Sequence, residues 1–134
     1  MIKLLLLLSV IIYQATPTQF IVKGTIRCNI RKKFNVTLVL EEFDEFTWDD
    51  TIKRKELINK ASGVTHNYTI QGTYSEGDGY FDFTYEPIIN FYHNCLTNRS
   101  DLGYIGKQFD GVPTSTPIAS FTYNVVLDDK IFQP

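Results

Sequence analysis

Residues 20–28 read FIVKGTIRC, and apolar side chains recur there at every second position. The even-numbered positions are apolar or glycine, whereas positions 23, 25 and 27 carry Lys, Thr and Arg. Successive side chains of a β-strand point to opposite faces, so a period of two is typical of a strand with one buried face. The stretch therefore predicts a half-buried antiparallel strand.

The same alternation extends to residues 34–41 (FNVTLVLE), 65–71 (THNYTIQ) and 119–125 (ASFTYNV). Pro87 opens a further expected strand over residues 88–93, IINFYH. Two other stretches are less regular. Residues 51–58 fit either a strand or a short helix, because the basic run at 53–55 blurs the period, and residues 103–109 form a weak strand candidate.

Turn-forming residues separate these stretches at positions 62–63, 77–79, 110–111 and 113–117. No long segment keeps the 3.6-residue apolar period of a helix. About seven short strands in one chain predict an all-β fold, a two-sheet antiparallel β-sandwich.

Composition narrows the class of protein. The chain has 134 residues, of which 43% are hydrophobic, 14% aromatic and 21% charged. This is too apolar for a disordered tail and too evenly mixed for a multispan membrane protein. The net charge of −2 argues against a nucleic-acid partner, because such proteins usually carry a basic surplus.

The first segment is typical of a secretion signal. One lysine, Lys3, precedes a nine-residue apolar stretch at 4–12, and polar and small residues follow. A membrane helix needs about 20 apolar residues, so we expect no transmembrane segment. An apolar strand or buried helix is the alternative. We predict a signal peptide at 1–18 and a domain at 19–134; cleavage after Ala15 also fits, but the bulky Tyr13 favours Thr18.

A secreted, extracellular protein, whether free or associated with the cell surface, matures in an oxidising compartment. Cys28 and Cys95 are the only cysteines, and a disulfide between them is the default state there. Closing the loop between them would remove chain entropy worth roughly 4 kcal/mol. Three N-x-S/T sequons also predict glycosylation, at Asn35, Asn67 and Asn98, and the first two fall on outward strand faces.

The sequence offers little for catalysis or metal binding. His66 and His93 are the only histidines, and neither belongs to a zinc-ligand spacing. We expect local packing and hydrogen bonding for His93, and no metal or other cofactor. Nucleophile-elbow and phosphate-loop motifs are absent, so we expect no catalytic residues and no enzyme activity.

Residues 41–50 place six carboxylates around three aromatic residues. A solvated loop is one interpretation. A Ca²⁺ or cationic-partner site is another, although the spacing fits no EF-hand. The aromatic residues can also cover the open end of the sandwich, or form a partner-binding tip, because aromatic side chains are enriched at interface hot spots. That tip would comprise Phe43, Phe46, Trp48, Asp49 and Asp50.

Several stretches resemble the nematode transthyretin-like family. Residues 22–29 (VKGTIRCN) resemble its first strand, with Gly, an apolar residue and Cys, and residues 35–42 with the acidic loop 44–50 resemble its second. Residues 68–76 (YTIQGTYSE) resemble the strand that ends in Gly and a Ser-Glu pair. Residues 87–95 (PIINFYHNC) match most closely, because Pro and alternating apolar residues lead to Tyr-His-x-Cys.

The chain departs from the family pattern after Cys95. Family members commonly carry further cysteines there, and this chain has none, so loss of a family partner is the alternative to a Cys28–Cys95 pair. Residues 96–109 are Gly-rich and less regular than the basic strand that the family has there. The stretch 76–87 is several residues longer than the corresponding stretch of the family. The chain is therefore similar to a divergent member.

The resemblance implies a transthyretin-like (prealbumin-like) sandwich and an extracellular role. We expect a secreted, non-catalytic binding protein whose partner is a small apolar ligand or a cell-surface or extracellular component. The alternative is a hydrolase of the hydroxyisourate hydrolase type. That related sandwich depends on clustered His and Arg and on a C-terminal Tyr-Arg-Gly-Ser tail, whereas this chain ends DKIFQP. The sequence does not indicate the oligomeric state.

Overall fold

The computed structural model describes residues 17–43, 48–75 and 84–132, and these residues form strands and no helix. Seven strands have five or more residues, as the sequence predicts, and three have two. In chain order they are β1 (Thr18–Arg27), β2 (Lys33–Glu42), β3 (Asp50–Ala61), β4 (His66–Tyr74), β5 (Thr84–Tyr85), β6 (Pro87–His93), β7 (Gly103–Gln108), β8 (Val112–Pro113), β9 (Ile118–Thr122) and β10 (Val125–Val126).

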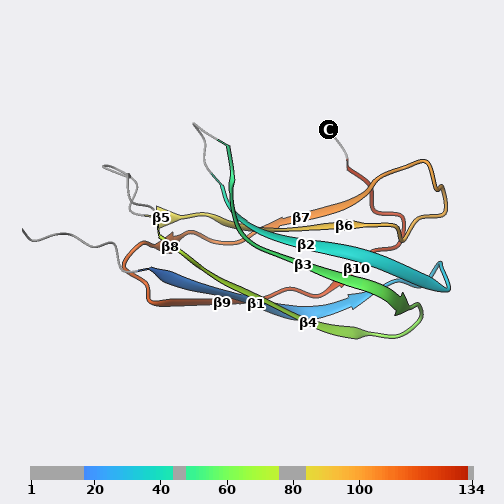
Figure 1. Cartoon of the computed structure of the whole chain (residues 1–134), viewed down its shortest axis with the longest axis horizontal. Helices are drawn as coiled ribbons and strands as arrows, with labels where there is room; N and C mark the ends of the chain where they lie inside the picture. Colours follow the sequence, from blue (N-terminus) through green and yellow to red (C-terminus); the bar gives the residue numbers. More distant parts are fainter. Residues whose placement is uncertain (1–16, 44–47, 76–83, 133–134) are drawn as a thin grey trace, which may run out of the picture.

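The strands form two stacked sheets, and this confirms the predicted two-sheet sandwich (Figure 1). In the sheet that we call the β1 sheet, β1 lies between β4 and the pair β9 and β10. In the other, the β2 sheet, the strand order is β3-β2-β6-β7 and every pairing is antiparallel. β5 and β8 form a small separate ladder.

β3 is a strand along its whole length and not a short helix. It pairs with β2 from Lys33↔Ala61 to Glu42↔Asp50, with register shifts between Phe34 and Val36 and between Leu40 and Glu41. Each shift inserts an extra residue into β3, and such a bulge moves the following side chains to the other face. The two bulges explain why the alternation is blurred in this stretch.

The sequence predicts a single antiparallel strand over residues 119–125, and this prediction is wrong. These residues form β9 and β10, which both run parallel to β1, with an interruption at residues 123–124. A Cβ at Gly24 would overlap the Tyr123 carbonyl oxygen, so glycine allows this close approach. The side-chain oxygen of Asn124 then accepts the Thr25 N–H at 3.0 Å and replaces a main-chain partner.

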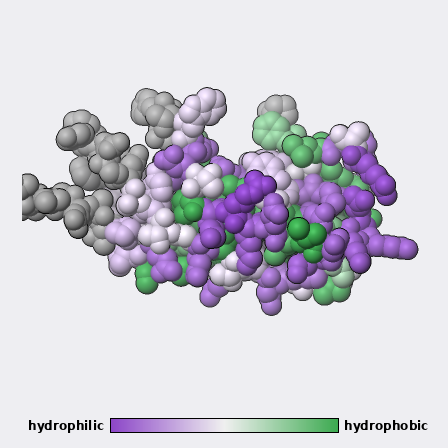
Figure 2. All heavy atoms as spheres, viewed as in Figure 1, coloured by the Kyte–Doolittle hydropathy of each residue, from purple (hydrophilic) through white to green (hydrophobic). Residues whose placement is uncertain are grey.

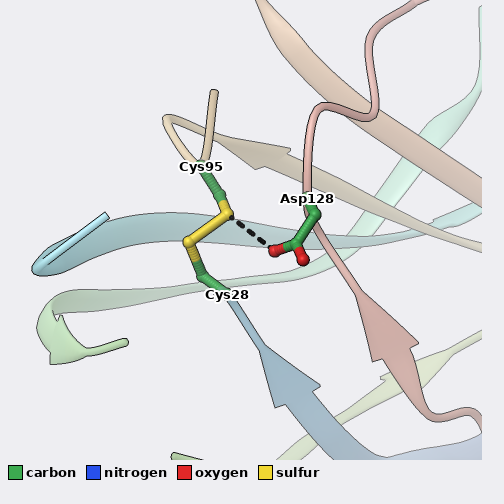
Figure 3. A group of neighbouring side chains, drawn as sticks. All are labelled: Cys28, Cys95 and Asp128. Atoms are coloured by element: carbon green, nitrogen blue, oxygen red, sulfur yellow. Dashed lines mark hydrogen bonds between the residues drawn. A yellow bond between two sulfur atoms is a disulfide. The ribbon is translucent and has the colours of Figure 1, made fainter. Parts of the chain in front are cut away.

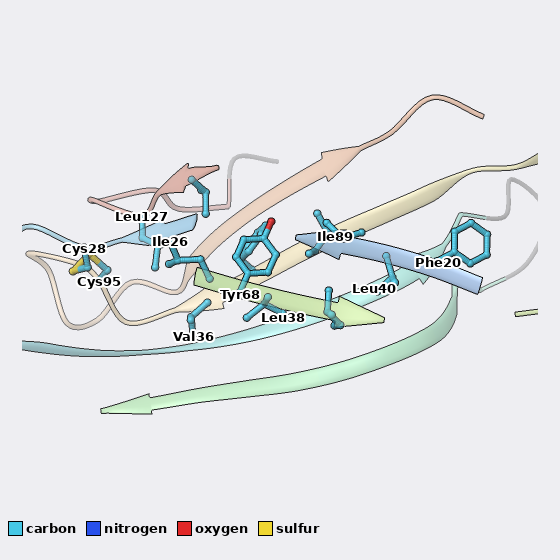
Figure 4. Close-up of a cluster of buried hydrophobic side chains, with 14 of the residues drawn as sticks. Phe20, Ile26, Cys28, Val36, Leu38, Leu40, Tyr68, Ile89, Cys95 and Leu127 are labelled. Atoms are coloured by element: carbon cyan, nitrogen blue, oxygen red, sulfur yellow. A yellow bond between two sulfur atoms is a disulfide. The ribbon is translucent and has the colours of Figure 1, made fainter. Parts of the chain in front are cut away.

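The inner faces of the two sheets form one apolar core (Figure 4). The alternating apolar side chains predicted to face inward on β1 and β2 are buried, and the labelled Phe20, Ile26, Leu38 and Leu40 are fully so. Burial of a large apolar side chain contributes about 1.5–3 kcal/mol. The one tyrosine hydroxyl shown in Figure 4, on Tyr68, is satisfied because it donates to the Tyr123 carbonyl at 2.6 Å.

A disulfide joins the sheets at one end of the core (Figure 3). Cys28 directly follows β1 and Cys95 lies just after β6; their Cα atoms are 5.9 Å apart and both residues are fully buried. The predicted pairing is confirmed. Asp128 lies beside it and accepts hydrogen bonds from the main-chain and side-chain nitrogens of Asn29, at 2.7 and 3.0 Å.

Figure 3 also marks a 3.5 Å contact between the Cys95 sulfur and the Asp128 carboxylate. A disulfide sulfur carries no proton, so this contact can become a hydrogen bond only after reduction. The structural contribution of Asp128 is therefore to hold the main chain that follows Cys28.

We predict that removing the disulfide strongly destabilises the fold. Cys28→Ala/Cys95→Ala should lower the free energy of unfolding by roughly 4 kcal/mol, because the unfolded chain regains the entropy of an open loop. Urea denaturation of the double variant and of the wild type, each with and without dithiothreitol, measures this. Reductant should shift the wild-type midpoint and leave the variant unchanged; an equally stable reduced wild type would contradict the prediction.

Candidate functional site

His93 and Cys95, from the Tyr-His-x-Cys stretch, have structural roles beside the disulfide. The ring nitrogen Nδ1 of His93 accepts the Cys95 N–H at 3.1 Å and so fixes the turn that presents Cys95 to Cys28. His93 pairs with Gly103 in β7, where an added Cβ would lie 2.6 Å from two atoms of the His93 ring. The local role predicted for His93 is confirmed.

Burial lowers the pKa of His93, and the nearby Lys130 backbone offsets this effect only in part, because the buried Nε2 of the ring has no hydrogen-bond partner among the described residues. The ring is therefore neutral at pH 7, which agrees with an unprotonated Nδ1 that accepts a hydrogen bond. His66 has a separate local role, because its Nε2 lies 2.7 Å from the Ala61 carbonyl oxygen and its ring packs on Phe34. The two histidines thus serve two different structural contacts.

We predict that His93 makes the fold sensitive to acid. Below a pH of about 6.5 the unfolded state binds a proton that the folded state resists, so stability falls as pH falls. His93→Asn keeps an acceptor for the Cys95 N–H but cannot titrate. The stability advantage of the wild type over this variant should shrink between pH 7 and 5, by at most about 1.4 kcal/mol per pH unit.

Urea midpoints at several pH values, together with an NMR titration of the His93 ring, measure the effect. A constant difference between the two proteins across that range, or a His93 pKa above that of a free histidine, would contradict it.

One group of side chains places three potential metal-ligand atoms within 4.8 Å of one another: Cys28, Cys95 and Asp128. Both sulfurs are bonded to each other in the disulfide, and a metal needs the thiolate form of cysteine. The group therefore does not form a metal site while the disulfide is intact.

The predicted partner-binding residues lie in and beside the β2–β3 connection. Phe43 is half-buried, and its N–H donates to the Glu86 carbonyl at 2.9 Å. Phe46 lies outside the described residues. Trp48 is 91% exposed, and the neighbouring Asp49 and Asp50 are exposed as well. Tyr74 donates to Asp50 at 2.6 Å. The structure therefore presents an indole to solvent at the start of β3.

The outer face of the β2 sheet carries a polar network that the sequence analysis did not single out. The Tyr104 hydroxyl donates to the Asn90 side-chain oxygen at 2.8 Å, and the Asn90 amide donates to Glu41 at 3.2 Å. Asn90 points away from the core, opposite Val39 and Gly106, yet it is only 5% exposed. Gly106 has no side chain, and an added Cβ would meet the Tyr104 hydroxyl.

Aromatic rings extend this network along β6, β7 and the C-terminal segment. The rings of Tyr92 and Tyr104 lie 5.4 Å apart, and Phe132 packs on Tyr104 at the same centroid distance. Such tilted and edge-to-face pairs are favourable ring geometries. We call this surface, formed by Glu41, Asn90, Tyr92, Tyr104 and Phe132, the tyrosine face.

The charge of Asp49, next to Trp48, affects the pKa of groups on the tyrosine face. Burial raises the pKa of Glu41, and the negative charge of Asp49 raises it further. Burial also raises the pKa of Tyr104, as do Tyr92 and the two carboxylates. Tyr92 likewise has a raised pKa, mainly from burial. Both phenols therefore keep their protons at neutral pH; the Tyr104 hydroxyl donates its proton to Asn90, whereas the Tyr92 hydroxyl can donate to a ligand.

One residue in the sequence, Asn90, indicates a polar site on this face. Asn90 interrupts an otherwise apolar and aromatic strand, and an amide in such a strand needs hydrogen-bond partners. Its partners come from β2 and β7, 49 and 14 residues away along the chain. Only the register of the three strands shows which residues these are.

All three sequon asparagines lie at exposed positions. The side-chain oxygen of Asn35 accepts the N–H of Asn59, a residue with a φ of 54° in the first β3 bulge. The side-chain oxygen of Asn98 accepts hydrogen bonds from the N–H and hydroxyl of Ser100. At Asn35 and Asn98 the side-chain oxygen makes the structural hydrogen bond. A glycan is attached through the side-chain nitrogen, so these hydrogen bonds leave the attachment atom available.

Comparisons with family models, curated proteins and solved structures found no match to this chain. In the part of the chain that the structure describes, no helix has the length and apolar character needed to cross a membrane.

Proposed function

We propose that the protein is a secreted, non-catalytic binding protein that recognises a cell-surface or extracellular component through Trp48, Asp49 and Asp50 at the start of β3 and through the tyrosine face. The observation that carries this proposal is Trp48, an indole that is 91% exposed and is followed by the exposed carboxylates of Asp49 and Asp50. Exposed aromatic groups rimmed by polar residues mark interaction sites, and Trp and Tyr dominate binding hot spots.

The interior supports a surface partner over a small apolar ligand. A carrier needs an enclosed apolar cavity that buries most of its ligand. Two hollows stand out among the described residues, of about 390 and 600 Å³, and both are surface grooves with charged residues in their lining. The space between the sheets is occupied by core side chains.

We also propose that the chain is a divergent member of the transthyretin-like family. Gly24, Cys28, His93 and Cys95 support this assignment, because each has a structural task in a two-sheet sandwich. The hydrolase alternative would need histidines and arginines to converge in one pocket. Both histidines instead have local contacts, and Arg31 donates to the Asn94 carbonyl at 2.8 Å.

Secretion requires removal of the signal, and the fold favours one of the two cleavage sites. Thr18 is fully buried, pairs with Tyr74 and donates to the Thr116 carbonyl at 2.7 Å. Cleavage after Thr18 would remove these contacts, whereas cleavage after Ala15 keeps them. We therefore revise the expected boundary and propose a mature chain that begins at Thr16.

We predict Thr16 as the first residue of the protein recovered from the medium of eukaryotic secreting cells. N-terminal sequencing of the recovered protein tests this, and intact-mass measurement before and after glycosidase treatment shows whether glycans are attached. An N-terminus at Gln19 would contradict the preferred cleavage site, and an intact Met1 would contradict secretion by this signal.

We predict that binding to extracellular material depends on Trp48. Fluorescently labelled wild-type protein should bind decellularised matrix saturably in about 0.5 M NaCl, where long-range charge attraction is screened. Trp48→Ala should weaken binding roughly tenfold or more, as loss of a hot-spot residue does, and Tyr104→Phe should have a smaller effect.

Ile118→Ala is the matched control, because Ile118 is an apolar residue 57% exposed on β9 of the other sheet, and it should change binding less than about twofold. Equal losses for Trp48→Ala and Ile118→Ala would contradict the proposed surface. Saturable binding of an apolar dye, unaffected by Trp48→Ala, would favour the small-ligand alternative instead.

A further inference from the structure

A second surface lies where the edges of the two sheets meet. β3 is the edge strand of the β2 sheet and β4 is the edge strand of the β1 sheet. Between them runs a surface groove of about 600 Å³, lined by residues 53–55 of β3 and 69–71 of β4. Figure 1 looks onto this side, and Figure 2 shows mainly hydrophilic side chains over β3. We call this hollow the edge groove.

The register between β2 and β3 places Lys53 and Lys55 on the side of β3 that faces the edge groove. Lys53 and Lys55 lie opposite Leu40 and Leu38, which point into the core. Because β3 is at the edge of its sheet, the two lysines project past the core to the gap between the sheets. Arg54, between them, faces the outer side of the sheet opposite Val39. All three basic residues are exposed.

The edge groove is built for side-chain contacts and not for an added strand. The Lys55 ammonium donates to the Thr69 carbonyl at 2.8 Å, which occupies an acceptor on the β4 edge. β3 and β4 also touch directly, because a Cβ at Gly72 would lie 2.8 Å from the Ile52 side chain and 3.1 Å from its carbonyl oxygen. A partner strand would have to separate these contacts before it could pair.

The charges near the groove form a row and do not converge on one point. Lys53, Lys55 and Lys60 lie opposite core residues of β2, whereas Arg54 faces the outer side of the sheet and pairs with Glu56 at 3.3 Å. β4 carries no acidic residue. At about 3.3 Å per residue, the row from Lys53 to Lys60 spans about 23 Å. A chain with a net charge of −2 thus concentrates cations along one edge. Such a row complements a linear polyanion better than a small anion.

We propose that the edge groove binds a linear sulfated polysaccharide. Lys53 and Lys55 would pair with successive sulfates, while the Thr69 hydroxyl and the Gln71 amide would hydrogen-bond sugar hydroxyls. Lysine ammoniums suit this partner because they are point charges that can follow a repeating anion. This inference concerns a different surface from the tyrosine face and does not depend on the binding function proposed there.

Heparin is the probe for the test. Isothermal titration at about 0.1 M NaCl should show saturable binding that weakens steeply as salt is added. Lys53→Gln/Lys55→Gln should weaken it roughly tenfold and reduce the salt dependence. The control Lys107→Gln/Lys130→Gln removes the same charge at exposed positions outside the groove and should change affinity less than about twofold. Lys53→Arg/Lys55→Arg, which keeps the charge, should retain binding within about threefold.

Thermal unfolding of every variant shows whether the fold is retained, and Trp48→Ala should bind heparin normally. Desulfated heparin should bind at least tenfold more weakly than heparin. The proposal is overturned if heparin does not bind, if the groove and control variants lose affinity equally, or if polyglutamate or double-stranded DNA binds as tightly as heparin. Those last two outcomes would indicate an acidic protein or a nucleic acid as the partner.

Discussion

The buried bond between Cys28 and Cys95 is the constraint on which the arrangement of the two sheets depends. Hydrogen bonds hold strands together within a sheet, but between the sheets the contacts are mainly apolar and non-directional. The disulfide fixes the end of β1 against the segment after β6 and therefore sets how the sheets align. His93, Gly103 and Asp128 surround it, and each holds main chain or a side chain in place beside it.

β1 transmits this constraint to the remainder of its sheet. It pairs with β4 on one side and with β9 and β10 on the other, so its position determines that of three strands. Because Gly24 has no side chain, the Tyr123 carbonyl can approach β1 closely. The same carbonyl accepts a hydrogen bond from the Tyr68 hydroxyl of β4. A single residue without a side chain thus allows β1, β4 and the β9–β10 segment to meet inside the core.

The outer surfaces differ in charge, and this difference separates the two proposed binding regions. Carboxylates gather near the β2–β3 connection and the tyrosine face, whereas β3 carries a row of cations beside β4. Lysines at an edge strand also discourage pairing with other chains, so the same residues protect the fold from aggregation. The two roles are compatible, because a flexible polyanion contacts ammonium groups and does not need the strand backbone.

The sequence by itself determined which faces of β1, β2 and β4 are buried, since a period of two separates core-facing from outward-facing side chains; the outward Val39 is buried as well. It also predicted the disulfide as the default state of its two cysteines, but only the structure decided between this pair and the loss of a family partner. Only the tertiary structure decided that β3 is a strand, that β9 and β10 run parallel to β1, and that Asn90 meets Tyr104 and Glu41. These features depend on bulges and on register between distant strands, and local alternation carries no information about either.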